Sequence, residues 1–193
     1  MKFEKPLAYF EETTAKSELI FDGRVLHVYR DEINTPNGGK SLREYCRHNG
    51  AVAVVPLTQD GRVVCVRQYR YALGRVVLEI PAGKFDYIGE DHEEAALREL
   101  REETGYTTDC LTPIGALSTS PALLTEIIYL YLAENMTPGE TEPDEDEFLE
   151  LVEIPLEELV DMILRGEVED AKTQAAVLKV WAMKQKAEKA QKE

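Results

Sequence analysis

Three glutamates spaced for one helix face, Glu99, Glu102 and Glu103, are the residues of this chain most suited to chemistry. On a helical period of 3.6 residues they fall within an arc of roughly 100°. Carboxylates at positions i, i+3 and i+4 repel each other, but such hard oxygen ligands suit Mg²⁺ or Mn²⁺, which keep water and substrate phosphates as further ligands. The alternative is an acidic solvated helix face, on which Arg98 pairs with Glu102 at i+4.

The helix that carries these glutamates is expected to begin after Asp91 and to end at Gly105. Asp91 is a good capping residue, and Glu94 three residues later completes a capping-box pattern. A glycine after the last turn is a common C-terminal stop. Leu100 belongs to a narrow apolar stripe that anchors the helix, whereas Ala95 is expected to leave the surface above the carboxylates open.

A longer pattern surrounds this helix, from Gly83 to Tyr106, with the sequence GKFDYIGEDHEEAALRELREETGY. It resembles the Nudix box, the defining motif of the Nudix hydrolases, which is written G-x5-E-x7-RE-U-x-EE-x-G-U with U an apolar residue. Here the first spacer, residues 84–89, holds six residues and thus one insertion, while every position from Glu90 onward is in register. The insertion leaves the shape of the loop open.

The composition is that of an ordinary soluble protein: 193 residues, 44% hydrophobic and 31% charged, enough for one full-sized domain and a small appendage. A net charge of −15 argues against nucleic acid or an anionic membrane as partner. It does not argue against phosphate substrates, since bound cations invert the local charge. The widely spaced, odd-numbered cysteines indicate reduced thiols, and no apolar run reaches bilayer length. We therefore expect a cytoplasmic protein.

The first part of the chain predicts a small antiparallel β-sheet. Residues 19–21 and 24–30 are strand-like, and Asn37-Gly38-Gly39 predicts a hairpin turn, after which 41–47 returns as a partner strand. A hairpin of this size is marginal by itself, so it must pack on the main domain or on a second chain. Residues 1–16 are mixed and polar, and we expect them to be loosely ordered.

The rest of the chain predicts further strands and helices. Strands are expected at 50–57, 62–70, 76–80, 111–117, 126–132 and 147–154, and helices at 156–164 and 173–183, besides the glutamate-bearing helix. Strands enclosing that helix, with a second helical layer, give an α/β fold: an α/β/α sandwich with a mixed sheet, of Nudix type, plus the small N-terminal antiparallel sheet. The predicted divisions are an N-terminal β appendage at 1–48, a Nudix hydrolase domain at 49–183 and a charged tail at 184–193.

Pro121, fifteen residues beyond Tyr106, resembles a mark of the ADP-ribose pyrophosphatase branch of the family. Residues 119–126, TSPALLTE, are similar to that branch's S-P-G-x-x-x-E segment, with Ala122 in place of the glycine. The alternative is that Pro121 only shapes a loop. Three further stretches point to the same branch: 66–70, 78–83 and 170–173. The resemblance also implies a homodimer formed through the N-terminal sheet.

The resemblance implies roles for individual residues. The implied metal ligands are the backbone carbonyl of Ala82 and the carboxylates of Glu99, Glu102 and Glu103. Glu102 and Arg98 also count among the catalytic residues, and Glu90 would brace the loop and orient Arg98. Arg70 and Glu79 match positions that contact the diphosphate and the adenosine or ribose part. Arg47 is a weaker candidate for substrate binding, because an isolated arginine on a strand more commonly forms a surface ion pair.

The acidic segment 142–147 has two interpretations. Blocks of like charge are most often solvated loops. The resemblance instead places a catalytic glutamate here, with Glu147 as first choice and Glu145 as second. A carboxylate is needed because water must be deprotonated and aimed at a phosphorus while metal ions neutralise the diphosphate.

The sequence thus predicts metal-dependent hydrolysis of the diphosphate bond of ADP-ribose to AMP and ribose 5-phosphate. A first alternative is another nucleoside diphosphate sugar, because the box recognises the diphosphate and not the sugar. A second alternative is a non-catalytic Nudix-like ligand sensor. The presence of Glu99, Glu102 and Glu103 argues against the sensor.

Overall fold

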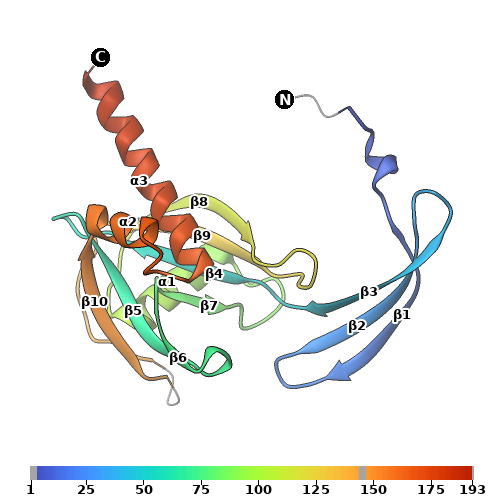
Figure 1. Ribbon diagram of the computed structural model, residues 1–193. Coiled ribbons are helices and arrows are strands. Elements are labelled where there is room, and N and C mark those ends of the chain that lie inside the picture. Colours follow the sequence, from blue (N-terminus) through green and yellow to red (C-terminus); the bar gives the residue numbers. More distant parts are fainter. Residues whose placement is uncertain (1–3, 144–146, 193) are drawn as a thin grey trace. The chain divides into compact units, whose positions relative to one another are not determined.

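The computed structural model describes residues 4–143 and 147–192 (Figure 1). The chain divides into two compact units. The first holds the chain up to His48 together with Ser120–Glu126, and the second holds Asn49–Thr119 and the chain from Ile127 onward. Among the described residues, every predicted site residue except Arg47 belongs to the second unit.

The first unit is a three-stranded antiparallel sheet in the order β1-β2-β3. Its elements are a 3-10 turn at Leu7–Tyr9, β1 at Thr13–Asp22, β2 at His27–Asn34 and β3 at Lys40–Arg47. Strand β1 begins within a stretch expected to be loosely ordered, because its backbone pairs with β2 from Thr13 opposite Asn34. Every residue of β1 is exposed.

The segment around Pro121 belongs to this first unit. The amides of Leu123 and Leu124 both donate to the carbonyl of Ser120, at 2.9 and 2.8 Å, so Pro121 lies in a turn. Leu124 forms a parallel bridge with Cys46 at the end of β3. The proline therefore shapes a loop that pairs with the N-terminal sheet.

The second unit contains two sheets. The mixed sheet has the order β7-β4-β9-β8 and consists of β7 at Ala82–Lys84, β4 at Ala51–Pro56, β9 at Ile127–Glu134 and β8 at Cys110–Ser118. The antiparallel sheet has the order β10-β5-β6 and consists of β10 at Leu149–Pro155, β5 at Arg62–Arg70 and β6 at Arg75–Glu79, with a 3-10 turn at Tyr71–Leu73. Strands β4 and β9 are parallel, which makes the first of these sheets mixed.

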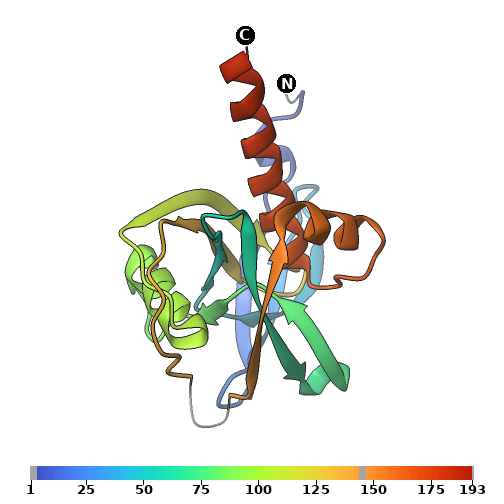
Figure 2. The ribbon, with the colours of Figure 1, turned by 90° about the vertical axis from the view of Figure 1, so that its left-hand side faces the viewer.

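Helices cover both sides of the strands (Figure 2). They are α1 at His92–Thr104, α2 at Leu156–Leu164 and α3 at Ala171–Lys192. Helix α2 has the predicted bounds, whereas α3 is longer than predicted and continues through most of the segment expected as a charged tail. The predicted α/β/α sandwich with a mixed sheet, accompanied by an N-terminal antiparallel sheet, is confirmed. In the part of the chain that the structure describes, no helix combines the length and apolarity needed to cross a membrane.

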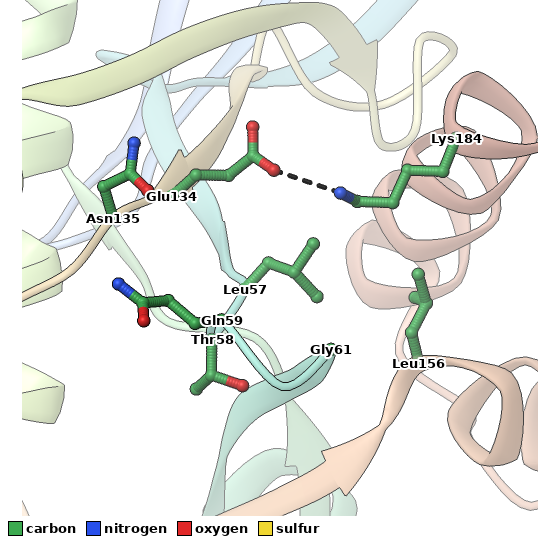
Figure 3. A pocket seen from close by; sticks show the side chains of 8 residues that line it. All are labelled: Leu57, Thr58, Gln59, Gly61, Glu134, Asn135, Leu156 and Lys184. Carbon is green, nitrogen blue, oxygen red and sulfur yellow. Dashed lines mark hydrogen bonds and ion pairs between the residues drawn. The ribbon is translucent and has the colours of Figure 1, made fainter. Parts of the chain in front are cut away.

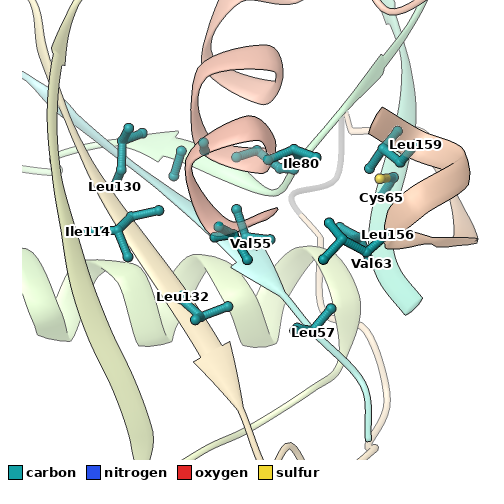
Figure 4. Packing of buried hydrophobic residues seen from close by; sticks show 14 of the residues in the cluster. Val55, Leu57, Val63, Cys65, Ile80, Ile114, Leu130, Leu132, Leu156 and Leu159 are labelled. Atoms are coloured by element: carbon teal, nitrogen blue, oxygen red, sulfur yellow. The ribbon is translucent and has the colours of Figure 1, made fainter. Parts of the chain in front are cut away.

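Strand β4 lies inside the second unit and is buried on both faces. Ala53 and Val55 point into the larger core, which α2 and α3 cover (Figure 4). Val52 and Val54 point into a smaller cluster with Ala95 and other residues of α1. The continuous apolar run of this strand is typical of strands covered on both sides, and its position fixes α1 against the mixed sheet.

Candidate active site

Helix α1 is fixed at both ends by its own sequence. The Asp91 side chain accepts hydrogen bonds from the amides of Glu93 and Glu94, at 2.9 and 3.1 Å, and so caps the helix as predicted. At the other end Gly105 has a φ of 75°, a left-handed conformation that glycine adopts without strain. The cap at Asp91 and the end at Gly105 determine where the glutamates lie along the helix axis.

The acidic face of α1 points inward. Glu99 and Glu103 are 8% and 5% exposed, and Ala95 is fully buried. The expectation of an open surface above the carboxylates was therefore wrong: the small side chain of Ala95 lets the helix approach β4 closely. The interpretation as an acidic solvated face is also wrong for Glu99 and Glu103. Only Glu102 keeps substantial exposure.

Both buried glutamates lie beside the backbone of residues 82 and 83. The Ala82 amide donates to Glu103 Oε2 at 3.3 Å. A Cβ at Gly83 would collide with the Glu99 carboxylate, so only glycine allows this carboxylate to approach the strand so closely. The first glycine of the box thus has a packing role that its sequence position alone did not reveal.

Arg98 connects the glutamates of α1 to the loop before it. Its Nη1 lies 2.7 Å from Glu99 Oε1 and 3.3 Å from Glu102 Oε2, which confirms the predicted i+4 pair. Its Nη2 donates to Glu90 Oε1 at 3.2 Å, while Glu90 Oε2 accepts from the Asp86 amide at 2.7 Å. Glu90 therefore holds both the loop with the insertion and the arginine.

Glu99, Glu102 and Glu103, which we call the carboxylate cluster, are short of positive charge. Burial raises the pKa of Glu103 to about 8, and the charges of Glu99 and Glu147 act in the same direction. Burial also raises the pKa of Glu99 to about 7, although the Arg98 guanidinium opposes this shift. The cluster would therefore gain from a cation that stabilises its ionised form.

The donors of this cluster fit a divalent cation. Two buried carboxylates one helical turn apart lie beside β7, where Gly83 leaves room for that of Glu99, and hard cations prefer oxygen ligands. Among the described residues, no group of three acidic, histidine or cysteine side chains is already arranged to hold a metal ion. Arg98 contacts one oxygen each of Glu99 and Glu102. The second oxygen of each carboxylate makes no hydrogen bond to Arg98, so a cation can bind there while the arginine stays in place.

A second group of charges lies in the same unit. Arg70 donates from Nε and Nη2 to the two oxygens of Glu79, at 2.6 and 2.7 Å. Lys172 also pairs with Glu79, and with Asp170 at 3.1 Å. We call Arg70, Glu79, Asp170 and Lys172 the mixed-charge cluster. The sequence predicted Arg70 and Glu79 as substrate-binding residues but gave no role to Lys172.

The two groups are electrostatically connected. The Lys172 charge lowers the pKa of Glu103, against the effect of burial, and the Glu103 charge acts on Arg70. Both groups are also linked through the short segment from Glu79 to Ala82, which ends beside Glu103. The structure thus brings Arg70 and Glu79 into the same region as the predicted metal-binding residues, although they come from different strands and helices.

The segment before β10 brings one predicted base into this region. Glu147 is partly buried, and its charge contributes to the raised pKa values of both Glu99 and Glu103. Upstream, the Glu142 amide donates to the carbonyl of Glu102 at 2.9 Å, which ties the acidic segment to the end of α1. The second predicted base, Glu145, lies outside the described residues.

Arg47 lies in the first unit, at the end of β3. Its guanidinium lies over the Tyr29 ring, 4.0 Å from the centroid, and Nη2 donates to the hydroxyl of Tyr45 at 3.3 Å. The rings of Tyr29 and Tyr45 are stacked, with centroids 5.8 Å apart. Arg47 thus makes cation–π contacts rather than the surface ion pair considered from the sequence.

A hollow of about 330 Å³ lies elsewhere in the second unit (Figure 3). It is lined by Leu57, Thr58, Gln59, Gly61, Glu134, Asn135, Leu156 and Lys184. The Lys184–Glu134 ion pair, 3.0 Å long, borders it. None of the predicted site residues lines this hollow, and its lining lacks the concentration of buried carboxylates that metal-assisted chemistry needs. The carboxylate cluster is therefore the candidate site for metal-assisted chemistry.

Comparison with known proteins shows the family of this chain. The model of the NUDIX domain family matches residues 47–177, so the chain belongs to this family and is a Nudix hydrolase. The ADP-ribose pyrophosphatase of Bacillus subtilis is 46% identical over 86% of this chain and 91% of the relative. A methanol dehydrogenase activator of Bacillus methanolicus is 45% identical over 87% and 91%. A GDP-mannose pyrophosphatase of Yersinia enterocolitica is 35% identical over 77% and 83%.

The fold has a close match among solved structures. The crystal structure of an ADP compounds hydrolase superposes with a TM-score of 0.80 at 28% sequence identity, covering 91% of this chain and 96% of that one. Family membership implies dependence on a divalent metal.

Proposed function

We propose that this protein hydrolyses the diphosphate bond of ADP-ribose to AMP and ribose 5-phosphate. The observation that carries the proposal is the buried Glu99–Glu103 pair beside Ala82 and Gly83, next to the Arg70–Glu79 pair. The Bacillus subtilis relative named ADP-ribose pyrophosphatase supports the choice of substrate, since the two chains match over most of their lengths.

The metal would be Mg²⁺ or Mn²⁺, held by Glu99, Glu102, Glu103 and the carbonyl of Ala82. When bound, such a cation neutralises charge on the diphosphate and lowers the pKa of water. The role of Arg98 would be to keep Glu99 and Glu102 in place, since its guanidinium contacts both.

Glu147 is the proposed general base, with Glu145 as the second choice. The base takes a proton from a water molecule as the water oxygen forms a bond to phosphorus, and the bridging P–O bond breaks as the other phosphate leaves. The support for Glu147 is its electrostatic effect on both Glu99 and Glu103, which requires proximity to them. A general base must lie within hydrogen-bond reach of the water that it activates, and a water held by the metal would lie beside Glu99 and Glu103.

The substrate would be oriented by Arg70, Glu79 and Arg47. Arg70 offers a guanidinium to the diphosphate, because its Nη1 makes no hydrogen bond to the described residues while Nε and Nη2 hold Glu79. Arg47, on the N-terminal sheet, is proposed to act in the same task from a partner chain. We also propose a cytoplasmic homodimer.

The exposed first unit supports the proposed homodimer. All of β1 is exposed, including Leu19, Ile20 and Phe21, which are 44%, 43% and 56% exposed. Apolar side chains gathered in this way on one strand commonly mark an interaction surface. Light scattering of the purified protein tests the proposal: a monomeric mass at micromolar concentration would contradict it.

The enzymatic proposal is tested by phosphate release from a panel of nucleoside diphosphate sugars with Mg²⁺ or Mn²⁺, using a coupled phosphatase. Turnover of ADP-ribose well above UDP- and GDP-sugars is the expected result. Preference for a GDP-sugar would favour the alternative that the GDP-mannose pyrophosphatase relative suggests, with the same chemistry at the diphosphate.

A second candidate function follows from the relative named methanol dehydrogenase activator, which matches this chain nearly as well as the first relative does. We propose testing whether this protein raises the rate of a methanol dehydrogenase. The wild type and a Glu103→Gln variant should be compared, because activation that depends on Glu103 would connect the two functions. No activation by either would remove this candidate.

A further inference from the structure

Lys172 is a buried cation that the proposed chemistry does not yet use. It lies in the first turn of α3 and is 9% exposed. Its ammonium pairs with Glu79 and, at 3.1 Å, with Asp170 Oδ1. A lysine is rarely buried without such partners, so its position is determined by these two carboxylates.

The same turn of α3 also holds the chain next to Glu79. Asp170 caps the helix by accepting from the amide and the hydroxyl of Thr173, at 2.8 and 2.6 Å. The Thr173 hydroxyl in turn accepts from the amide of Ile80 at 2.9 Å. The first turn of α3 therefore contacts two successive residues: it forms an ion pair with Glu79 and a hydrogen bond with Ile80.

The following residues are held by other elements. The carbonyl of Pro81 accepts from the Val54 amide at 2.9 Å, in β4, and the Ala82 amide donates to Glu103 in α1. The segment 79–82 is thus fixed at each step between the mixed-charge cluster and the carboxylate cluster. A shift of Glu79 would change the distance between the guanidinium of Arg70 and the metal-binding carboxylates.

Charge balance gives Lys172 a second effect. Burial by itself would raise the pKa of Glu79, but the hydrogen bonds from Arg70 and the charge of Lys172 outweigh it and keep the pKa below its usual range. Without Lys172, a carboxylate that is 3% exposed would depend on Arg70 alone for its charge compensation. Arg70 would then have less positive potential to offer to a diphosphate.

We propose that Lys172 is a positioning residue for substrate binding, which holds the Glu79 carboxylate at the first turn of α3 and thereby aims Arg70 at the diphosphate. The inference rests on the proposed function to the extent that Arg70 contacts the substrate. Through Lys172, helix α3 would control how tightly the substrate binds.

The test compares Lys172→Met with Lys184→Met, a matched control on the same helix that breaks the Lys184–Glu134 pair instead (Figure 3). The substrate is whichever nucleoside diphosphate sugar the wild type hydrolyses fastest, so a wrong sugar does not affect the comparison. We expect K172M to raise KM about tenfold with kcat changed less than about twofold, and K184M to change neither. Equal KM values for K172M and K184M would overturn the inference.

A double-mutant cycle separates positioning from general stability. If Lys172 acts through Arg70, the increase in KM caused by K172M is lost when Arg70 is already replaced by alanine. An undiminished increase in the Arg70→Ala background would show that Lys172 does not act through Arg70. If K172M does not fold, K172Q, which keeps hydrogen-bond donors without the charge, carries the same comparison. Hydrolysis of no sugar by the wild type would instead overturn the proposed function.

Discussion

The carboxylate cluster and the mixed-charge cluster both bury glutamates, but their charges are balanced differently. In the mixed-charge cluster, Glu79 is 3% exposed and is held by two cations. In the carboxylate cluster, Glu103 is 5% exposed, yet its side-chain hydrogen bond comes from a backbone amide. Burial raises the pKa of both carboxyls, but the two cations beside Glu79 outweigh it, so that the pKa of Glu79 is lowered while that of Glu103 is raised.

This difference indicates which cluster is complete by itself. A buried carboxylate with paired cations is satisfied by the protein, whereas buried carboxylates that repel each other need a further cation. The mixed-charge cluster is therefore suited to hold a fixed geometry, and the carboxylate cluster to bind a metal ion. Four experiments can sharpen or break this comparison.

Replacing Glu103 by Gln is expected to have the largest effect. Turnover with saturating Mg²⁺ should fall by roughly 100-fold or more, because a buried metal ligand is lost while the amide fits the same space. Steady-state kinetics with a Mg²⁺ titration, together with a thermal melt, measure this. Glu94→Gln, an exposed position on the same helix, is the control. Unchanged turnover would remove Glu103 from the metal site.

Replacing Glu147 by Gln tests the proposed base. We expect kcat to fall by roughly 100-fold, as general bases commonly contribute that much, with little change in substrate affinity. Kinetics together with binding of a non-hydrolysable analogue distinguish the two effects. An effect on KM alone would take the base role away from Glu147 and leave Glu145 as the candidate.

Replacing Glu79 by Gln tests whether the mixed-charge cluster is stabilised by its balance of charge. Lys172 would lose its buried partner, and we expect the free energy of unfolding to fall by about 2 to 3 kcal/mol, less than for a fully buried pair because Arg70 is partly exposed. Urea denaturation measures the change. A variant as stable as the wild type would mean that the balance of charge is not needed for folding.

The dependence of stability on pH should be the smallest effect. For Glu99 and Glu103 the folded pKa values, about 7 and about 8, exceed the unfolded value of 4.5, so the folded state binds more protons between these limits. Their contribution to stability is therefore complete below the unfolded pKa and is lost as the pH rises through the folded values.

The metal-free protein, kept in a chelator, should accordingly melt at a lower temperature at pH 9 than at pH 6. Glu103→Gln should show a smaller difference between the two pH values, and added Mg²⁺ should raise the melting temperature most at the higher pH. A melting temperature of the metal-free wild type that rises from pH 6 to pH 9 would contradict the origin assigned to these pKa shifts.

Local features of the chain were predictable because their causes are local. The cap at Asp91, the stop at Gly105 and the Arg98–Glu102 pair depend on residues within one or two helical turns. The buried strand β4 and the bounds of α2 follow from apolar patterns of the same range. The Nudix box added the family, and the comparison with known proteins confirms it.

Features that depend on long-range contacts were missed or predicted wrongly. The burial of Ala95 depends on β4, about forty residues earlier, and the early start of β1 depends on its pairing with β2. Lys172 lies 93 positions from Glu79 along the chain, and nothing next to it in the sequence shows that the two meet. The periodicity of apolar residues describes one helix or strand at a time. It does not show which other element packs against that helix or strand.

The sequence by itself determined the helix that carries the glutamates, its two ends and the family to which the chain belongs, because these depend on neighbouring residues and on a motif in register. The tertiary structure alone decided that Glu103 is buried beside a backbone amide and that Glu99 is buried with one cation, Arg98, while Glu79 is buried with two. The physical reason is that the pKa of a carboxylate depends on burial and nearby charge, and both are set by packing between distant segments.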